Sequence, residues 1–79
     1  MHADEIKQFL HASPFRPFTV YLAIEKSFVV PHQDFAWLTP KGRTLFVSVA
    51  DKEAVDLLDV ALISRIEPHE PPPGSPKNQ

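Results

Sequence analysis

The segment VPHQDF, residues 30–35, brings together the two side chains of this sequence with the most obvious chemistry, His32 and Asp34. An imidazole and a carboxylate two residues apart can share a metal ion, or can act as a general base and the group that orients it. On one strand the two side chains would lie on the same face, about 7 Å apart, where a ligand can bridge them. A zinc site would also need a third ligand, which His11 or His69 would have to supply.

The same segment is also typical of a corner between two strands, and this is the interpretation we favour. Pro31 lacks a backbone donor and ends strand pairing, and Asp34 can accept hydrogen bonds from backbone amides in a turn. Phe35 and Trp37 then fall on one face of the next strand. We therefore assign no catalytic residue, metal or cofactor, and keep a metal or hydrolytic site at His32 and Asp34 as a weaker hypothesis.

A second set of residues with binding chemistry consists of Tyr21, Trp37, Lys41 and Arg43. Aromatic rings on strands, flanked by cations, can stack and hold single-stranded RNA. The formal net charge is -2, however, and the eight lysines and arginines are dispersed along the chain, which argues against DNA and against strong nonspecific binding of nucleic acid. Aromatic residues at strand spacing in so small a domain more often belong to the core or to a subunit interface.

The length of the chain, 79 residues, predicts one small domain and an oligomer. A core of this size buries only about 60% of the unfolded surface, so that disulfides, a metal or self-association usually add stability. The sequence contains no cysteine, and its four histidines are scattered, which leaves self-association as the favoured source. No leader and no long apolar run are present, and we expect a soluble, cytoplasmic protein.

The segment ADEIKQFLHAS, residues 3–13, predicts a short helix. Ile6, Phe9 and Leu10 form one apolar stripe, and Ser13 ends the helix because it precedes a proline. The connector PFRPF follows, and we expect its two phenylalanines to pack under the helix. Its Arg16 is expected to pair with a carboxylate such as Glu67.

From Phe18 onward the apolar residues recur with period two, which predicts strands. Residues 54–66 allow two interpretations. They form either a strand, a tight break near 59–61 and a last strand, or one terminal helix with an apolar stripe. The alternation in LISRIE favours the two strands. The helical spacing of four apolar residues favours the helix: Val55, Leu58, Leu62 and Ile66. We favour the strands, the earlier ones being expected at 18–24, 27–32, 35–39 and 43–50.

The expected fold is therefore α+β, with an N-terminal helix followed by a strongly bent five-stranded antiparallel sheet or a small open barrel, Sm-like or SH3-like. Residues 1–67 form the single globular domain. Residues 68–79 contain five prolines and no large apolar side chain, which predicts a disordered tail.

Two stretches resemble the Sm-like fold, in particular the bacterial Sm-like RNA chaperone family Hfq. FTVYLAIEKSF, residues 18–28, resembles its first strand and turn, and ISRIEP, residues 63–68, resembles its closing strand. The resemblance implies an Sm-like fold and RNA binding. Where that family carries a Tyr-Lys-His run before the closing strand, this chain has Asp59, Val60 and Ala61, so the RNA site is not carried over residue by residue.

A second resemblance spans residues 4–67. The pattern PFRPF, then VPH, then a final apolar segment ending in Arg-Ile-Glu is similar to a group of short bacterial proteins of unknown activity. The sequence thus favours a small non-enzymatic interaction module that acts as a homo-oligomer. An Sm-like RNA-binding protein with Tyr21, Trp37, Lys41 and Arg43 at its site is the alternative. No membrane contact is expected.

Overall fold

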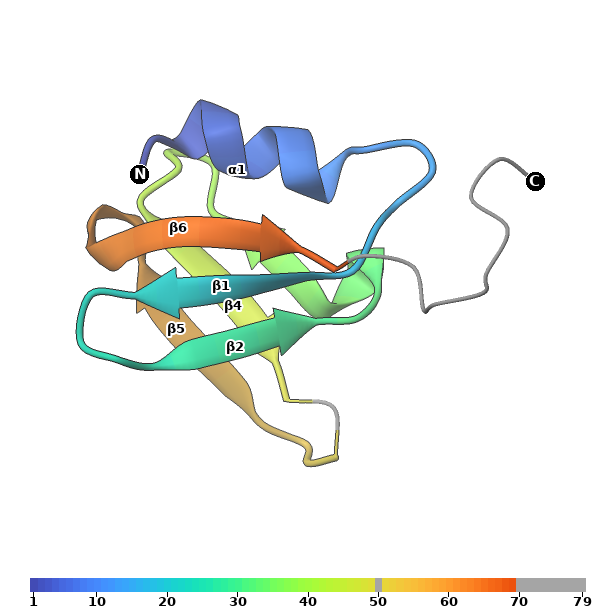
Figure 1. Ribbon diagram of the computed structural model, residues 1–79. Coiled ribbons are helices and arrows are strands. Elements are labelled where there is room, and N and C mark those ends of the chain that lie inside the picture. Colours follow the sequence, from blue (N-terminus) through green and yellow to red (C-terminus); the bar gives the residue numbers. More distant parts are fainter. Residues whose placement is uncertain (50, 70–79) are drawn as a thin grey trace.

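The computed structural model describes residues 1–49 and 51–69 and contains one helix and six strands (Figure 1). No helix in that part of the chain is long and apolar enough to cross a membrane. The elements in chain order are helix α1 (Ala3–Leu10), strands β1 (Phe18–Leu22) and β2 (Ser27–Val30), 3-10 helix η1 (Gln33–Phe35), strands β3 (Ala36–Leu38), β4 (Thr44–Ser48) and β5 (Val55–Asp59), 3-10 helix η2 (Val60–Leu62) and strand β6 (Ile63–Pro68).

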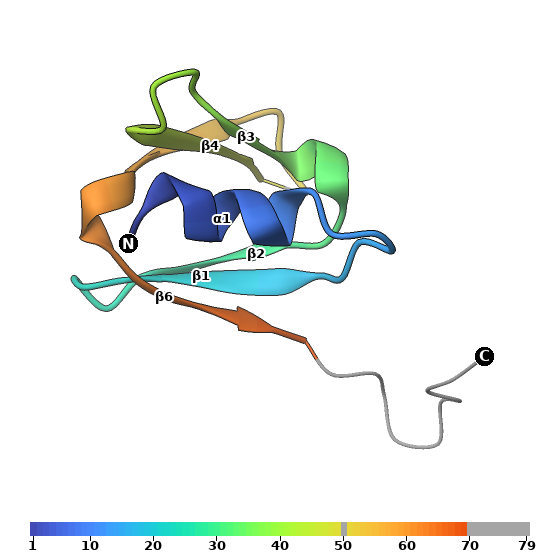
Figure 2. The same cartoon turned by 90° about the horizontal axis from the view of Figure 1, so that it is seen from above.

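The strands form two three-stranded antiparallel sheets, in the orders β2-β1-β6 and β3-β4-β5. Figure 2 shows the two sheets as separate layers, with α1 lying across the opening between them. The predicted α+β class is confirmed. The stated number of five strands is one too few. The four earlier strands and the two favoured within residues 54–66 make six, as the structure has them, with η2 as the break between β5 and β6.

The break between β5 and β6 shows why a single terminal helix over residues 54–66 is wrong. The carboxylate of Asp59 accepts a hydrogen bond from the Ala61 amide at 3.0 Å, which caps η2. The amide of Val60 donates to the carbonyl of Arg43 at 2.9 Å, and the Val60 side chain is buried. A capped turn of three residues therefore holds the chain as it passes from one sheet to the other.

The core combines side chains from both sheets and from α1. Ile6 and Leu10 of the predicted helical stripe are buried, and Phe9 packs against the core beside them. Phe18 is fully buried, and its ring centroid lies 5.6 Å from that of Phe9 and 5.8 Å from that of Phe15. Phe18 thus packs against the helix as expected, and Phe15 packs beside Phe18.

The turn between β3 and β4 packs closely against the start of α1. Gly42 has φ of +72°, a conformation that side chains rarely adopt, and a Cβ atom built on it would lie 2.5 Å from the Cβ of Ala3. The turn is closed by a hydrogen bond from the Gly42 amide to the carbonyl of Thr39. Glycine is required here both for the backbone conformation and for the close approach.

The junction between the helix and β1 differs from the expectation at Arg16. Its guanidinium donates to the backbone carbonyl of His69 at 2.9 Å, whereas Glu67 forms an ion pair with Arg65 on its own strand. The His69 amide in turn donates to the carbonyl of Pro17. The first two residues of the predicted tail are thus ordered, because Pro68 ends β6 and His69 is held by these two bonds. The rest of the predicted tail, residues 70–79, lies outside the described residues.

Candidate interaction surface

His32 and Asp34 lie at the corner between the two sheets. His32 precedes η1 and Asp34 lies within it, and both are exposed. The turn is closed by a hydrogen bond from the Phe35 amide to the His32 carbonyl at 3.1 Å. The expected bonds from backbone amides to the Asp34 carboxylate do not form within the described part of the chain, because the 3-10 turn satisfies itself through its backbone.

The ring of His32 packs beside that of Phe35, with the two centroids 5.4 Å apart. This contact gives His32 a structural position that the sequence did not indicate. Across residues 1–49 and 51–69, no three histidine, aspartate or glutamate side chains gather as the ligands of a metal ion would. The corner thus places His32 and Asp34 near each other without adding a third ligand from the described residues.

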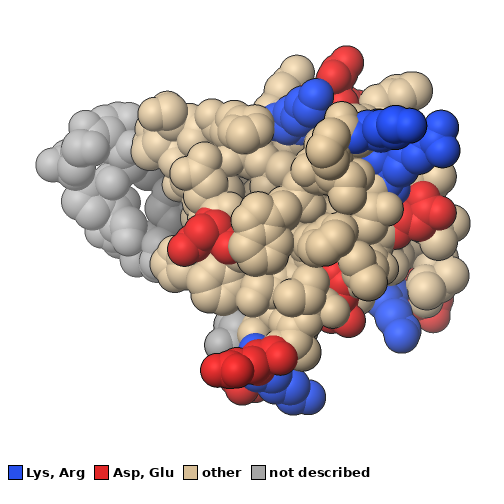
Figure 3. Space-filling model, turned by 180° about the vertical axis from the view of Figure 1, so that it is seen from behind, with Lys and Arg blue, Asp and Glu red and all other residues tan. Residues whose placement is uncertain are grey.

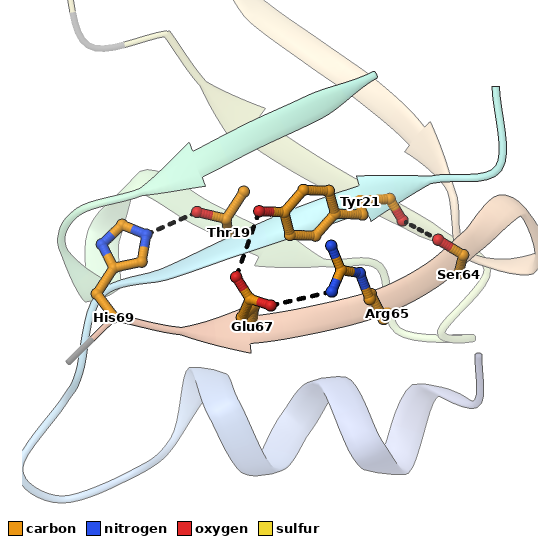
Figure 4. A network of polar contacts seen from close by, with 6 residues as sticks. All are labelled: Thr19, Tyr21, Ser64, Arg65, Glu67 and His69. Atoms are coloured by element: carbon orange, nitrogen blue, oxygen red, sulfur yellow. Dashed lines mark hydrogen bonds and ion pairs between the residues drawn. The ribbon is translucent and has the colours of Figure 1, made fainter. Parts of the chain in front are cut away.

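Tyr21 belongs to a polar cluster on the outer face of the β2-β1-β6 sheet, which Figure 4 shows from close by. The guanidinium of Arg65 lies 4.0 Å from the centre of the Tyr21 ring, and Arg65 pairs with Glu67 at 2.9 Å. The Tyr21 hydroxyl donates to Glu67 over 3.5 Å, and Ser64 donates to the Tyr21 carbonyl. One face of the Tyr21 ring is therefore already covered by a cation of its own sheet.

The cluster continues toward the end of β6 through Thr19 and His69. A hydrogen bond of 2.6 Å joins Thr19 Oγ1 and His69 Nε2, and Thr19 is the one buried polar residue among those described (Figure 4). This bond holds the residue after β6 against β1. The cluster links neighbouring strands and is explained by that structural role.

Trp37 lies on the opposite side of the molecule, on the outer face of the β3-β4-β5 sheet. The strand register places it directly beside Phe46 of β4, and Phe46 directly beside Leu57 of β5. We call these three residues the apolar row. Trp37 is 50% exposed and Leu57 is 66% exposed, and Val55, two residues before Leu57, is also exposed.

Seen from the side that carries this sheet, the surface is largely free of charge in its centre, with lysines, arginines and carboxylates toward the margins (Figure 3). Large apolar groups exposed together on a small protein are typical of an interaction surface. Neither Phe46 nor Leu57 was singled out from the sequence. Their alternation with buried neighbours was visible there, but the register that aligns them with Trp37 depends on strand pairing.

Lys41 and Arg43 flank this surface at one end. Both lie in or next to the β3–β4 turn and line an open surface cavity of about 690 Å³ together with Leu57 and the first residues of the chain. The structure thus brings Lys41 and Arg43 to the margin of the apolar row. It does not bring Tyr21 there, because Tyr21 belongs to the outer face of the other sheet.

Comparison of the chain with protein-family models, with curated proteins and with solved structures gave no match.

Proposed function

We propose that this protein is a small non-enzymatic interaction module that acts as a homo-oligomer. The observation that carries the proposal is the apolar row, which crosses the whole β3-β4-β5 sheet on its solvent side and reaches the edge strand β5. Side chains such as Trp37 and Leu57 gain free energy when they leave water, at roughly 25 cal/mol for each Å² of apolar surface buried. A second copy offers an identical surface on which to bury them.

The size of the domain supports the same proposal. The fully buried side chains are few, and a chain of 79 residues without cysteine has no disulfide to add stability.

We also propose that the two sheets are the halves of a small, partly open barrel of the Sm-like or SH3-like kind. The pairing of the first strand with the last, β1 with β6, supports it, as does the continuation of β2 through one short corner into β3.

The mass in solution tests the proposed function. Sedimentation equilibrium or light scattering on the full chain, over a series from low micromolar to near millimolar concentration, is expected to show a mass that rises to a whole multiple of 8.9 kDa. A globular standard of known mass serves as the control for non-ideality. A compact monomer at every concentration would contradict the proposal.

RNA binding is the second candidate, and the position of Lys41 and Arg43 beside the apolar row favours it over a metal or hydrolytic site at His32 and Asp34. Filter binding with short A-rich and U-rich RNA over a salt series would detect it, since phosphate contacts weaken as salt rises. A Lys41→Ala, Arg43→Ala double variant should then lose affinity, whereas Lys26→Ala, in the β1–β2 turn, should not. The absence of binding at low salt would eliminate this candidate.

A further inference from the structure

Four strands of the two sheets are edge strands, and they differ in how open their edges are. β3 has three residues and lies against α1. β2 has four residues and is followed by Pro31, whereas β6 ends in Pro68 and pairs with β1 through a register shift. Short strands, prolines and irregular pairing all hinder the addition of another strand. β5 is the remaining edge, with five regularly paired residues that include neither proline nor lysine.

The hydrogen bonds of β5 determine which of its backbone groups face outward. The amide of Val49 donates to the carbonyl of Ala54, and the amide of Val60 donates to the carbonyl of Arg43. In an antiparallel ladder, alternate residues point their amide and carbonyl groups toward the neighbouring strand. Since Ala54 and Val60 point toward β4, the alternate residues Val55, Leu57 and Asp59 direct their backbone groups away from it. The carbonyl of Asp59, the N-cap of η2, accepts the first hydrogen bond of that 3-10 helix, so both backbone groups of Val55 and Leu57 and the amide of Asp59 are the ones open to another strand.

We propose that two copies of this chain pair β5 against β5, antiparallel, about a two-fold axis at Leu57. The inference rests on the proposed homo-oligomer and names the edge and the register that form it. Each Leu57 lies opposite Leu57 of the second copy, and each Val55 lies opposite Asp59 of the second copy. This register pairs both backbone groups of each Leu57 with those of the other Leu57, and it joins the carbonyl of each Val55 to the amide of Asp59 of the second copy. One two-fold contact closes a dimer.

The charges of β5 agree with this register. Its two acids are Asp56 and Asp59, and a dimer centred on Leu57 places Asp59 opposite Val55 and Asp56 opposite Leu58 of the second copy. No two carboxylates oppose each other, whereas a shift of the register that set Asp59 opposite Asp59 would place like charges together.

The apolar row gives the same register a second source of stability. Because Leu57 ends the row at the open edge, pairing at Leu57 makes the row continuous across both copies, with the two leucines adjacent at its centre. The order becomes Trp37, Phe46, Leu57, then Leu57, Phe46, Trp37 of the second copy. Exposed leucines brought beside each other on one sheet face shield each other from water.

The absence of cysteine makes the register directly measurable by disulfide trapping in the full chain. Opposed residues that exchange backbone hydrogen bonds in an antiparallel ladder have Cα atoms about 5.5 Å apart. This distance lies within the range that a disulfide bridges. A Leu57→Cys variant under mild oxidation is expected to give a covalent dimer on a non-reducing gel. A Val55→Cys variant alone should stay monomeric on the gel, but should link when mixed with an Asp59→Cys variant.

The matched pair of cysteine variants separates this inference from the proposed function. Dimers in which Val55→Cys links to itself, or in which Leu57→Cys does not link, would overturn the β5 register while leaving self-association intact. A protein that is monomeric by mass would overturn both. In addition, Leu57→Lys should raise the dimer dissociation constant at least tenfold with an unchanged circular dichroism spectrum, because residue 57 is exposed in the single chain. An unchanged dissociation constant would contradict the inference.

Discussion

Glu25 is the one residue other than glycine, among those described, with a positive φ, at 63°. It lies in the turn between β1 and β2, where its amide donates to the carbonyl of Leu22 and the Leu22 amide donates to the carbonyl of Lys26. These bonds hold the left-handed conformation, which costs an ordinary residue of order 1–3 kcal/mol. Neither glycine nor asparagine marks this position, and the conformation was therefore not foreseeable from residue type.

A Glu25→Gly variant is expected to raise the free energy of unfolding by about 0.5–1 kcal/mol. Glycine removes the steric cost of the positive φ, and part of that gain is lost to the greater entropy of its unfolded chain. The neighbouring substitution Lys26→Gly has only the entropic effect and should lower the free energy of unfolding by a similar amount. Urea denaturation of both variants measures the difference, and a loss of stability in Glu25→Gly would show that the turn does not require this conformation.

At the scale of elements, α1 is held by its docking, since a helix of eight residues is not stable alone in water. Its spacing of apolar residues was sufficient to predict which face is buried, because Ile6 and Leu10 recur at helical intervals. The strands were equally visible as period-two stretches. Their ends were less so: β1 stops at Leu22, and Ile24, which continued the alternation, lies exposed in the turn.

Replacing Ile6 with alanine should lower the free energy of unfolding by about 2–4 kcal/mol, because Ile6 is fully buried and its removal leaves a cavity between α1 and the sheets. Gln8→Ala on the exposed side of the same helix is the control and should change stability by less than about 0.5 kcal/mol. Both are measured by urea denaturation at one protein concentration. Equal effects for the two variants would argue against a docked helix.

For the molecule as a whole, the pairing of β1 with β6 and the row formed by Trp37, Phe46 and Leu57 were beyond the reach of sequence reasoning. Periodicity assigns a residue to a face of its own strand, but it does not say which strand lies alongside or in what register. For the same reason, the sequence could not show which of the candidate binding residues lie on the same sheet. Trp37, Lys41 and Arg43 lie on one side of the molecule, whereas Tyr21, expected beside them, lies on the other sheet.

Self-association also predicts that thermal stability depends on concentration. An equilibrium that binds the folded chain to another folded chain stabilises it by mass action, so the melting temperature should rise with the logarithm of protein concentration. Differential scanning calorimetry at a series of concentrations measures this rise. The Leu57→Lys variant is the control and should melt at nearly the same temperature throughout. A rise of the same size in that variant would place the association elsewhere on the surface.

The position of α1 beside β3 limits how far a sheet built in this way can grow. In the proposed dimer, the outermost strands of the combined sheet would both be β3, and each lies next to the helix of its own chain. The side chain of Gln33, in η1 just before β3, donates to the carbonyl of Leu10 at the end of that helix. A helix against an edge strand obstructs the approach of another strand. In the proposed dimer, the N-terminal helix would therefore keep a pairwise contact from extending into a fibre.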